Sequence, residues 1–137
     1  MKILFDASAM FASTRGGGIY NYLVKLLPRL ARLTENNGHD FRHFHLSFRG
    51  TSSSNGLIPD EKVIRIRFPV KLMNRLWLDF SLPDLSWFWK DIDIFHSPHF
   101  SLPVISKAKK ILTVNDIAYL KYPQYYAESG KKLNEYG

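Results

Sequence analysis

The stretch from Lys2 to Leu27, KILFDASAMFASTRGGGIYNYLVKLL, decides the fold of this chain. It opens with a short apolar run that ends in small and polar residues, which is typical of a buried strand reaching the edge of a sheet. Three consecutive glycines, Gly16, Gly17 and Gly18, follow, and from Ile19 onward apolar residues recur at helical spacing. The stretch therefore predicts a strand, a glycine loop and an amphipathic helix in direct succession.

The predicted helix places Leu23, Leu26 and Leu27 on the face that packs against the sheet. Pro28 lies inside it, and a proline at such a position removes one backbone hydrogen bond. We expect a kink at Pro28 unless packing in the folded protein absorbs it. The polar segment ENNGHD ends the helix.

The remainder of the chain continues to alternate strands with helices. Helical segments are expected between residues 71 and 89, with a break near Pro83. Strands are expected in DFRHFHLSF (40–48), KVIRIRF (62–68), DIDIFHSP (91–98) and KKILTVND (109–116). This order predicts an α/β fold, a Rossmann-like open parallel sheet with helices on both faces. His39, His43 and His45 lie on or beside the second predicted strand, away from the polar residues that follow the other strands. We interpret these three histidines as structural.

Composition narrows the class of partner without choosing one. Nineteen Lys and Arg against 12 Asp and Glu give a net charge of +7, which suits nucleic acid, an anionic lipid surface or a phosphorylated small molecule. Part of the excess lies in two separate clusters, residues 65–75 and 106–110, and no nucleic-acid motif is present, so nucleic acid is disfavoured. The chain has no cysteine, no signal-peptide pattern and no run of about twenty apolar residues, which favours a cytoplasmic protein.

The polar residues of interest follow predicted strands. In open α/β sheets ligands bind outside the carboxyl ends of the strands, so we expect the glycine loop, His96, His99, Asn115 and Asp116 to lie at one edge. The two histidines could exchange a proton or orient a hydroxyl, or be structural. Asn115 and Asp116 end the fifth predicted strand, where Asp116 could bind a sugar hydroxyl or cap a turn. No metal is expected, because neither a third histidine nor a cysteine lies nearby.

The glycine loop matches no standard phosphate-binding signature. Gly16, Gly18 and Asn21 give G-x-G-x-x-N, whose third position departs from the dinucleotide fingerprint, and no Lys-Ser or Lys-Thr pair follows as in a P-loop. Glycines before a helix nevertheless leave its first amides open to an anion. The loop is therefore either a ligand contact or a plain connector.

The richest apolar stretch offers two interpretations. Core packing is the preferred one, and a resting place on a membrane interface is the alternative, which needs the tryptophans to be exposed. The residues concerned are Trp77, Leu78, Phe80, Trp87, Phe88 and Trp89, with Arg75 and Lys90 beside them.

Four segments, in this order, resemble the N-terminal half of the family 4 (group 1) glycosyltransferases, whose fold is termed GT-B. They are GGGIYNYLVKLLPRLAR (16–32), NRLWLDFSLPDL (74–85), DIFHSPHFSLP (93–103) and KKILTVNDIAYLKYP (109–123), and the resemblance extends over about Lys2 to Tyr126. Members of that family have two Rossmann-like domains facing across a cleft. They transfer a sugar from a nucleotide-sugar to an acceptor with retention of configuration, usually without a metal.

The resemblance implies roles for particular residues. Gly16, Gly17 and Gly18 would border the donor phosphates and the acceptor, and His96 and His99 match the histidine-bearing strand end. Relatives commonly carry a His-Asp pair after the fifth strand, whereas here Asn115 takes the position of the histidine. An amide keeps hydrogen bonding but cannot shuttle a proton.

The resemblance also sets the expected domain organisation and function. Residues 1–137 correspond to a truncated N-terminal domain without the C-terminal nucleotide-sugar domain, so we expect this portion alone to be inactive. The expected enzyme is a hexosyltransferase, similar to mannosyltransferases, acting on a saccharide or lipid-linked acceptor in polysaccharide biosynthesis, with peripheral contact to the inner face of an anionic membrane. The alternative is a non-catalytic Rossmann-like module that binds a sugar or phosphate, or a partner.

Overall fold

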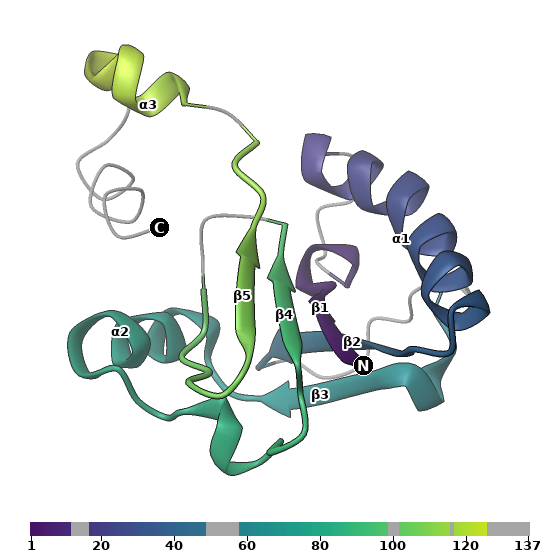
Figure 1. Cartoon of the computed structure of the whole chain (residues 1–137). Helices are drawn as coiled ribbons and strands as arrows, with labels where there is room; N and C mark the ends of the chain where they lie inside the picture. Colours follow the sequence, from purple (N-terminus) through teal and green to yellow (C-terminus); the bar gives the residue numbers. More distant parts are fainter. Residues whose placement is uncertain (12–16, 49–57, 99–101, 116, 126–137) are drawn as a thin grey trace.

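Strands and helices alternate along the chain (Figure 1). The computed structural model describes residues 1–11, 17–48, 58–98, 102–115 and 117–125. The strands are β1 (Lys2–Asp6), β2 (Asp40–Ser47), β3 (Val63–Arg67), β4 (Ile94–Ser97) and β5 (Lys109–Leu112). The α-helices are α1 (Gly18–Asn36), α2 (Val70–Phe80) and the short α3 (Ala118–Lys121). Single 3-10 turns are η1 (Ser8–Met10), η2 (Asp60–Lys62), η3 (Leu85–Trp87) and η4 (Pro123–Tyr125).

The five strands form one sheet in the order β3-β2-β1-β4-β5, and every neighbouring pair is parallel. β1 lies in the middle, where it pairs with β2 through Asp6 opposite Phe44 and with β4 through Phe5 opposite His96. The predicted α/β fold with a Rossmann-like open parallel sheet is confirmed.

Alternate residues of each strand serve the two faces of the sheet. Leu4 joins the cluster on the side of α2, whereas the next residue, Phe5, joins the cluster on the side of α1. Figure 1 shows α1 and α2 on opposite sides of the sheet. The helices therefore cover both faces, and each face has its own apolar cluster.

α1 packs on the sheet through Leu23 and Leu27, which are buried among the side chains of β1 and β2. The helix continues through Pro28, which lies on its exposed side, from Gly18 to Asn36. It ends in the predicted polar segment, where Gly38 takes a left-handed conformation (φ 71°) and its amide donates to the Glu35 carbonyl at 2.9 Å. A glycine suits this place because it adopts a positive φ without steric cost.

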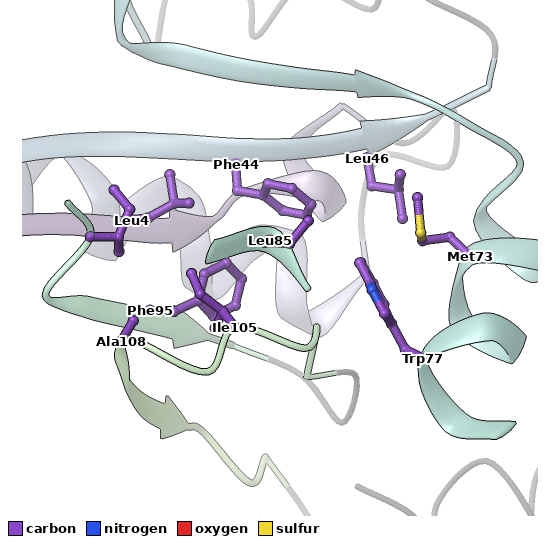
Figure 2. Packing of buried hydrophobic residues seen from close by; sticks show 10 residues of the cluster. Leu4, Phe44, Leu46, Met73, Trp77, Leu85, Phe95, Ile105 and Ala108 are labelled. Atoms are coloured by element: carbon purple, nitrogen blue, oxygen red, sulfur yellow. The ribbon is translucent and has the colours of Figure 1, made fainter. Parts of the chain in front are cut away.

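On the other face, α2 is held by side chains one helical turn apart. Figure 2 shows Met73 and Trp77 of α2 beside Leu46 of β2, and all three belong to one buried cluster. The indole Nε1 of Trp77 also donates to the Pro83 carbonyl at 3.1 Å. That bond ties the end of α2 to the turn that follows it.

The expectation that the whole aromatic stretch lies in the core is wrong in part. Trp77 is 6% exposed and Trp89 packs at the edge of the same cluster, but Trp87 is 60% exposed. Phe80 and Phe88 are exposed as well. A helix of eleven residues packed on a sheet buries only the positions that face it, and the turn after it buries Leu85 instead of its aromatic neighbours.

The interpretation of His43 as structural is consistent with its burial. His43 packs edge-on against Phe41 with ring centroids 5.0 Å apart, and among the described residues nothing hydrogen-bonds its buried Nδ1. Burial, followed by the nearby charge of Lys62, lowers the pKa of His43 to about 4. The folded protein therefore holds His43 neutral.

Two tryptophans of this face provide a paired test of packing. Trp77→Ala should lower the free energy of unfolding by about 3–5 kcal/mol, because it removes a large buried side chain. Trp87→Ala should change it by less than about 0.5 kcal/mol, because its ring is mostly in solvent. Urea denaturation followed by circular dichroism measures both, and equal losses would contradict the described burial.

The pH dependence of stability tests the state of His43. The unfolded chain binds a proton at this residue near pH ~6.5 and the folded chain only near pH ~4, so stability falls as the pH drops between these values. We expect a loss of about 2 kcal/mol in the free energy of unfolding at about pH 5 relative to about pH 7. His43→Leu should reduce this loss, and an unchanged slope in His43→Leu would contradict the assignment.

Candidate functional site

The strand order fixes where a ligand site is expected. From β1 the chain proceeds to β2 and β3 on one side, then returns to β4 and β5 on the other. In open parallel sheets such a reversal opens a crevice outside the carboxyl ends of the two strands that flank it. Here these strands are β1 and β4, and Figure 1 shows α1 starting at the end toward which the arrows of β4 and β5 point.

His96 is the last residue but one of β4 and is fixed from two sides. Its ring packs edge-on against Phe5 with centroids 4.6 Å apart, and its Nε2 lies 2.8 Å from the Thr113 hydroxyl. Burial lowers the pKa of His96 below its usual 6.5. At neutral pH the ring is therefore an uncharged imidazole, which can both donate and accept hydrogen bonds.

The segments that leave β4 and β5 are tied together. The Thr113 amide donates to the Ser97 carbonyl at 2.8 Å, and Nδ2 of Asn115 donates to the Pro98 carbonyl at 2.7 Å. Asn115 lies three residues beyond Leu112, the last residue of β5, so the prediction that it ends the strand is wrong. After Leu112 the regular hydrogen bonding between β4 and β5 stops. The chain is then held to the segment after β4 by individual hydrogen bonds, one of them from the Asn115 side chain.

Gly17 and Gly18 form the start of α1. Gly17 is the N-cap, with extended backbone (φ −71°, ψ 163°), and no side chain in the described ranges caps the helix. The first turn contains no acidic residue, and a Cβ added at either glycine would meet no atom of the described residues within 4 Å. First-turn amides without a side-chain cap favour negative charge beside them.

The predicted site residues divide into two groups. His96 and Asn115 lie at neighbouring strand ends, and Gly17 and Gly18 lie at the same end of the sheet, across the strand-order reversal. The other three predicted residues, Gly16, His99 and Asp116, lie outside the described residues.

Thr113, the partner of His96, was missed by the sequence prediction. The alternation of side chains along a strand could have indicated it. Ile111 lies opposite His96 in the register, and Thr113, two residues further along, lies on the same face of the sheet as Ile111. A hydroxyl at that position is therefore within reach of the imidazole.

A second group at the carboxyl edge was also missed. His45 lies level with Ala7, just past the end of β1, so it is closer to this edge than its sequence position suggests. Its ring stacks on Phe11 with centroids 4.1 Å apart, and the Arg65 guanidinium lies 5.9 Å from the centre of the Phe11 ring. Burial, then the charge of Arg65, lowers the pKa of His45, while Asp6 acts in the opposite direction.

In the part of the chain that the structure describes, no group of three or more His, Cys, Asp or Glu side chains could hold a metal ion. Within the same ranges, no helix has the length and apolar character needed to cross a bilayer.

Comparison with known proteins identifies no relative. No protein-family model matches the chain, and neither the curated proteins nor the solved structures gave a match. Fold and site define the class as an α/β protein with a Rossmann-like parallel sheet. The resemblance to family 4 glycosyltransferases stays a prediction that depends on the four sequence segments.

Alanine at the two described glycines separates a structural from a ligand-binding role. A Cβ at Gly17 or Gly18 meets none of the described atoms within 4 Å, and neither φ is positive. Gly17→Ala and Gly18→Ala should therefore keep the free energy of unfolding within about 1 kcal/mol of the original value, and Gly18→Ala should raise it slightly. Thermal denaturation provides the measurement. A larger loss would mean that the fold itself requires these glycines.

Proposed function

We propose that this chain is the acceptor-side portion of a retaining glycosyltransferase. The enzyme would move a hexose, with mannose the type that the sequence resemblance suggests, from a nucleotide-sugar donor to a saccharide or lipid-linked saccharide. The proposed setting is polysaccharide assembly in the cytoplasm. The donor is a substrate, and the proposal includes no metal ion.

The observation that carries the proposal is the environment of His96. This neutral imidazole lies at the carboxyl end of β4, where Phe5 packs against it and the Thr113 hydroxyl forms a hydrogen bond with it. Such a group can orient a sugar hydroxyl or exchange its proton. Its place beside the strand-order reversal is where α/β proteins bind ligands.

The start of α1 supports the donor side of the proposal. Uncapped first-turn amides attract phosphate oxygens, and Gly17 and Gly18 leave space for them. Sugar transfer also requires both substrates to be held in reacting geometry, which in the proposed architecture depends on a second domain. We therefore expect activity from the product of the complete gene, assayed with a panel of nucleotide sugars, and turnover with none of them would contradict the proposal.

One observation favours a second candidate, a binding module without catalysis. Asn115, which takes the position of a histidine in the resembling family, uses its amide to hold the Pro98 carbonyl. A residue employed in this way fastens the two strand ends together and exchanges no proton. On this alternative the same edge would bind a sugar or phosphate and release it unchanged.

Replacing His96 distinguishes the two candidates. In the complete gene product, His96→Ala should lower kcat by about a hundredfold if the imidazole orients or exchanges the acceptor proton. His39→Ala is the matched control, because His39 precedes β2 at the opposite end of the sheet. Unchanged kcat in His96→Ala would refute the role assigned to His96. Ligand binding by isothermal titration without any turnover would support the binding module.

A further inference from the structure

Thr113 lies directly after β5, at the carboxyl edge of the sheet, and is attached there in two ways. Its backbone amide donates to the Ser97 carbonyl at 2.8 Å, and its hydroxyl lies 2.8 Å from Nε2 of His96. The amide bond fixes the backbone without using the side chain. The hydroxyl therefore adds a contact with the imidazole to a residue whose place is already set.

The neighbours of His96 on its face of the sheet are otherwise apolar. Phe5 lies opposite it on β1 and Ile111 opposite it on β5, and Ile94 precedes it by two residues on β4. Burial lowers the pKa of His96, and no charged side chain of the described residues contributes to this shift. The Thr113 hydroxyl is thus a single polar contact to the ring in an apolar setting.

The two ring nitrogens of His96 differ in what they meet. Nε2 meets the Thr113 hydroxyl. In the described part of the chain, the buried side-chain nitrogens that lack a hydrogen-bond partner are Nδ1 of His43 and Nδ1 of His45. Nδ1 of His96 is not one of them, and the hydrogen bond given for this ring runs through Nε2. Nδ1 of His96 is therefore open to solvent, and a ligand that reaches the ring meets this nitrogen.

From this arrangement we infer that Thr113 is a positioning residue: its hydroxyl accepts the Nε2 proton of His96, which leaves Nδ1 to accept a hydrogen bond from a ligand hydroxyl. A neutral imidazole carries one proton, and the hydrogen bond at one nitrogen sets which nitrogen holds it. A threonine hydroxyl brings no negative charge that would favour the protonated ring, as a carboxylate would. This inference rests on the proposed function, because it assigns the acceptor hydroxyl of the transfer to one atom.

The opposite arrangement would have a different chemical consequence. The Thr113 hydroxyl would donate to Nε2, and the ring proton would lie on Nδ1. That nitrogen could donate to a ligand, but it could not accept the proton of a sugar hydroxyl. The position of the ring proton therefore decides between the two arrangements.

Nitrogen NMR of the isotope-labelled chain locates the ring proton, and His96→Ala identifies the signals of His96 by removing them. At neutral pH, Nε2 should have the chemical shift of a protonated nitrogen and Nδ1 that of an acceptor nitrogen. Thr113→Val keeps the branched shape of the side chain and removes the hydroxyl. This variant should speed the exchange of the Nε2 proton with water at least about tenfold, whereas Thr113→Ser should keep the original rate.

Thr34→Val is the matched control. The Thr34 hydroxyl donates to the carbonyls of Leu30 and Ala31 near the end of α1, so the same substitution there removes a hydroxyl that does not contact His96. It should leave the exchange of the Nε2 proton unchanged. Circular dichroism checks that each variant is folded.

Kinetics of the complete gene product test the link to the reaction. Thr113→Val should lower kcat about tenfold and change KM by less than about twofold, because a misplaced imidazole affects the reacting hydroxyl more than substrate binding. Thr113→Ser should restore kcat, since it supplies the same acceptor oxygen. A threonine needed only for packing would not be replaced by serine in this way.

Three outcomes would overturn the inference. They are a ring proton on Nδ1, an unchanged exchange rate in Thr113→Val, and an equal loss of kcat in Thr113→Val and Thr113→Ser. The NMR measurement contains neither donor nor acceptor sugar. The expected NMR result without any sugar transfer would therefore refute the proposed function while confirming that Thr113 positions His96.

Discussion

The fold depends on the burial of β1 on both of its faces and its pairing along both of its edges. Leu4 and Phe5 are fully buried on opposite sides of the sheet, and the strand pairs with β2 on one edge and β4 on the other. Such a strand cannot lie at the margin, so the chain must place elements on both sides of it. The reversal of strand order between β1 and β4, where ligands are expected in open parallel sheets, follows from that single constraint.

The same constraint places groups of different chemistry at one end of the sheet. The start of α1 presents backbone amides that favour negative charge, while β4 presents a neutral imidazole that can handle a hydroxyl. An anion on one side and a hydroxyl on the other are what a glycosyl transfer from a phosphorylated donor requires. The proposed function therefore depends on complementary chemistry at one edge of the sheet.

The two faces of the sheet differ in how their helices are completed. α1 is long and buries apolar side chains along several of its turns, whereas α2 is short and depends on Met73, Trp77 and the bonded turn that follows it. That turn uses its polar groups internally, through Asp84 and Ser86, and directs its aromatic rings outward. The protein consequently has its candidate site at the carboxyl ends of the strands and carries exposed aromatic rings, Trp87 and Phe88, in the turn after α2.

The periodicity of the sequence by itself determined the strands, the long helix with its end near Gly38, and the alternating order that makes the sheet parallel. These properties are local, because they arise from which residues are apolar and how they are spaced. Only the tertiary structure decided that Thr113 meets His96, that Asn115 bonds Pro98, and that Trp77 is buried while Trp87 is exposed. Each of these contacts depends on strand register or on the orientation of a turn. Residues far apart in the sequence determine the register and the orientation together, so the spacing of residues along the chain cannot specify these contacts.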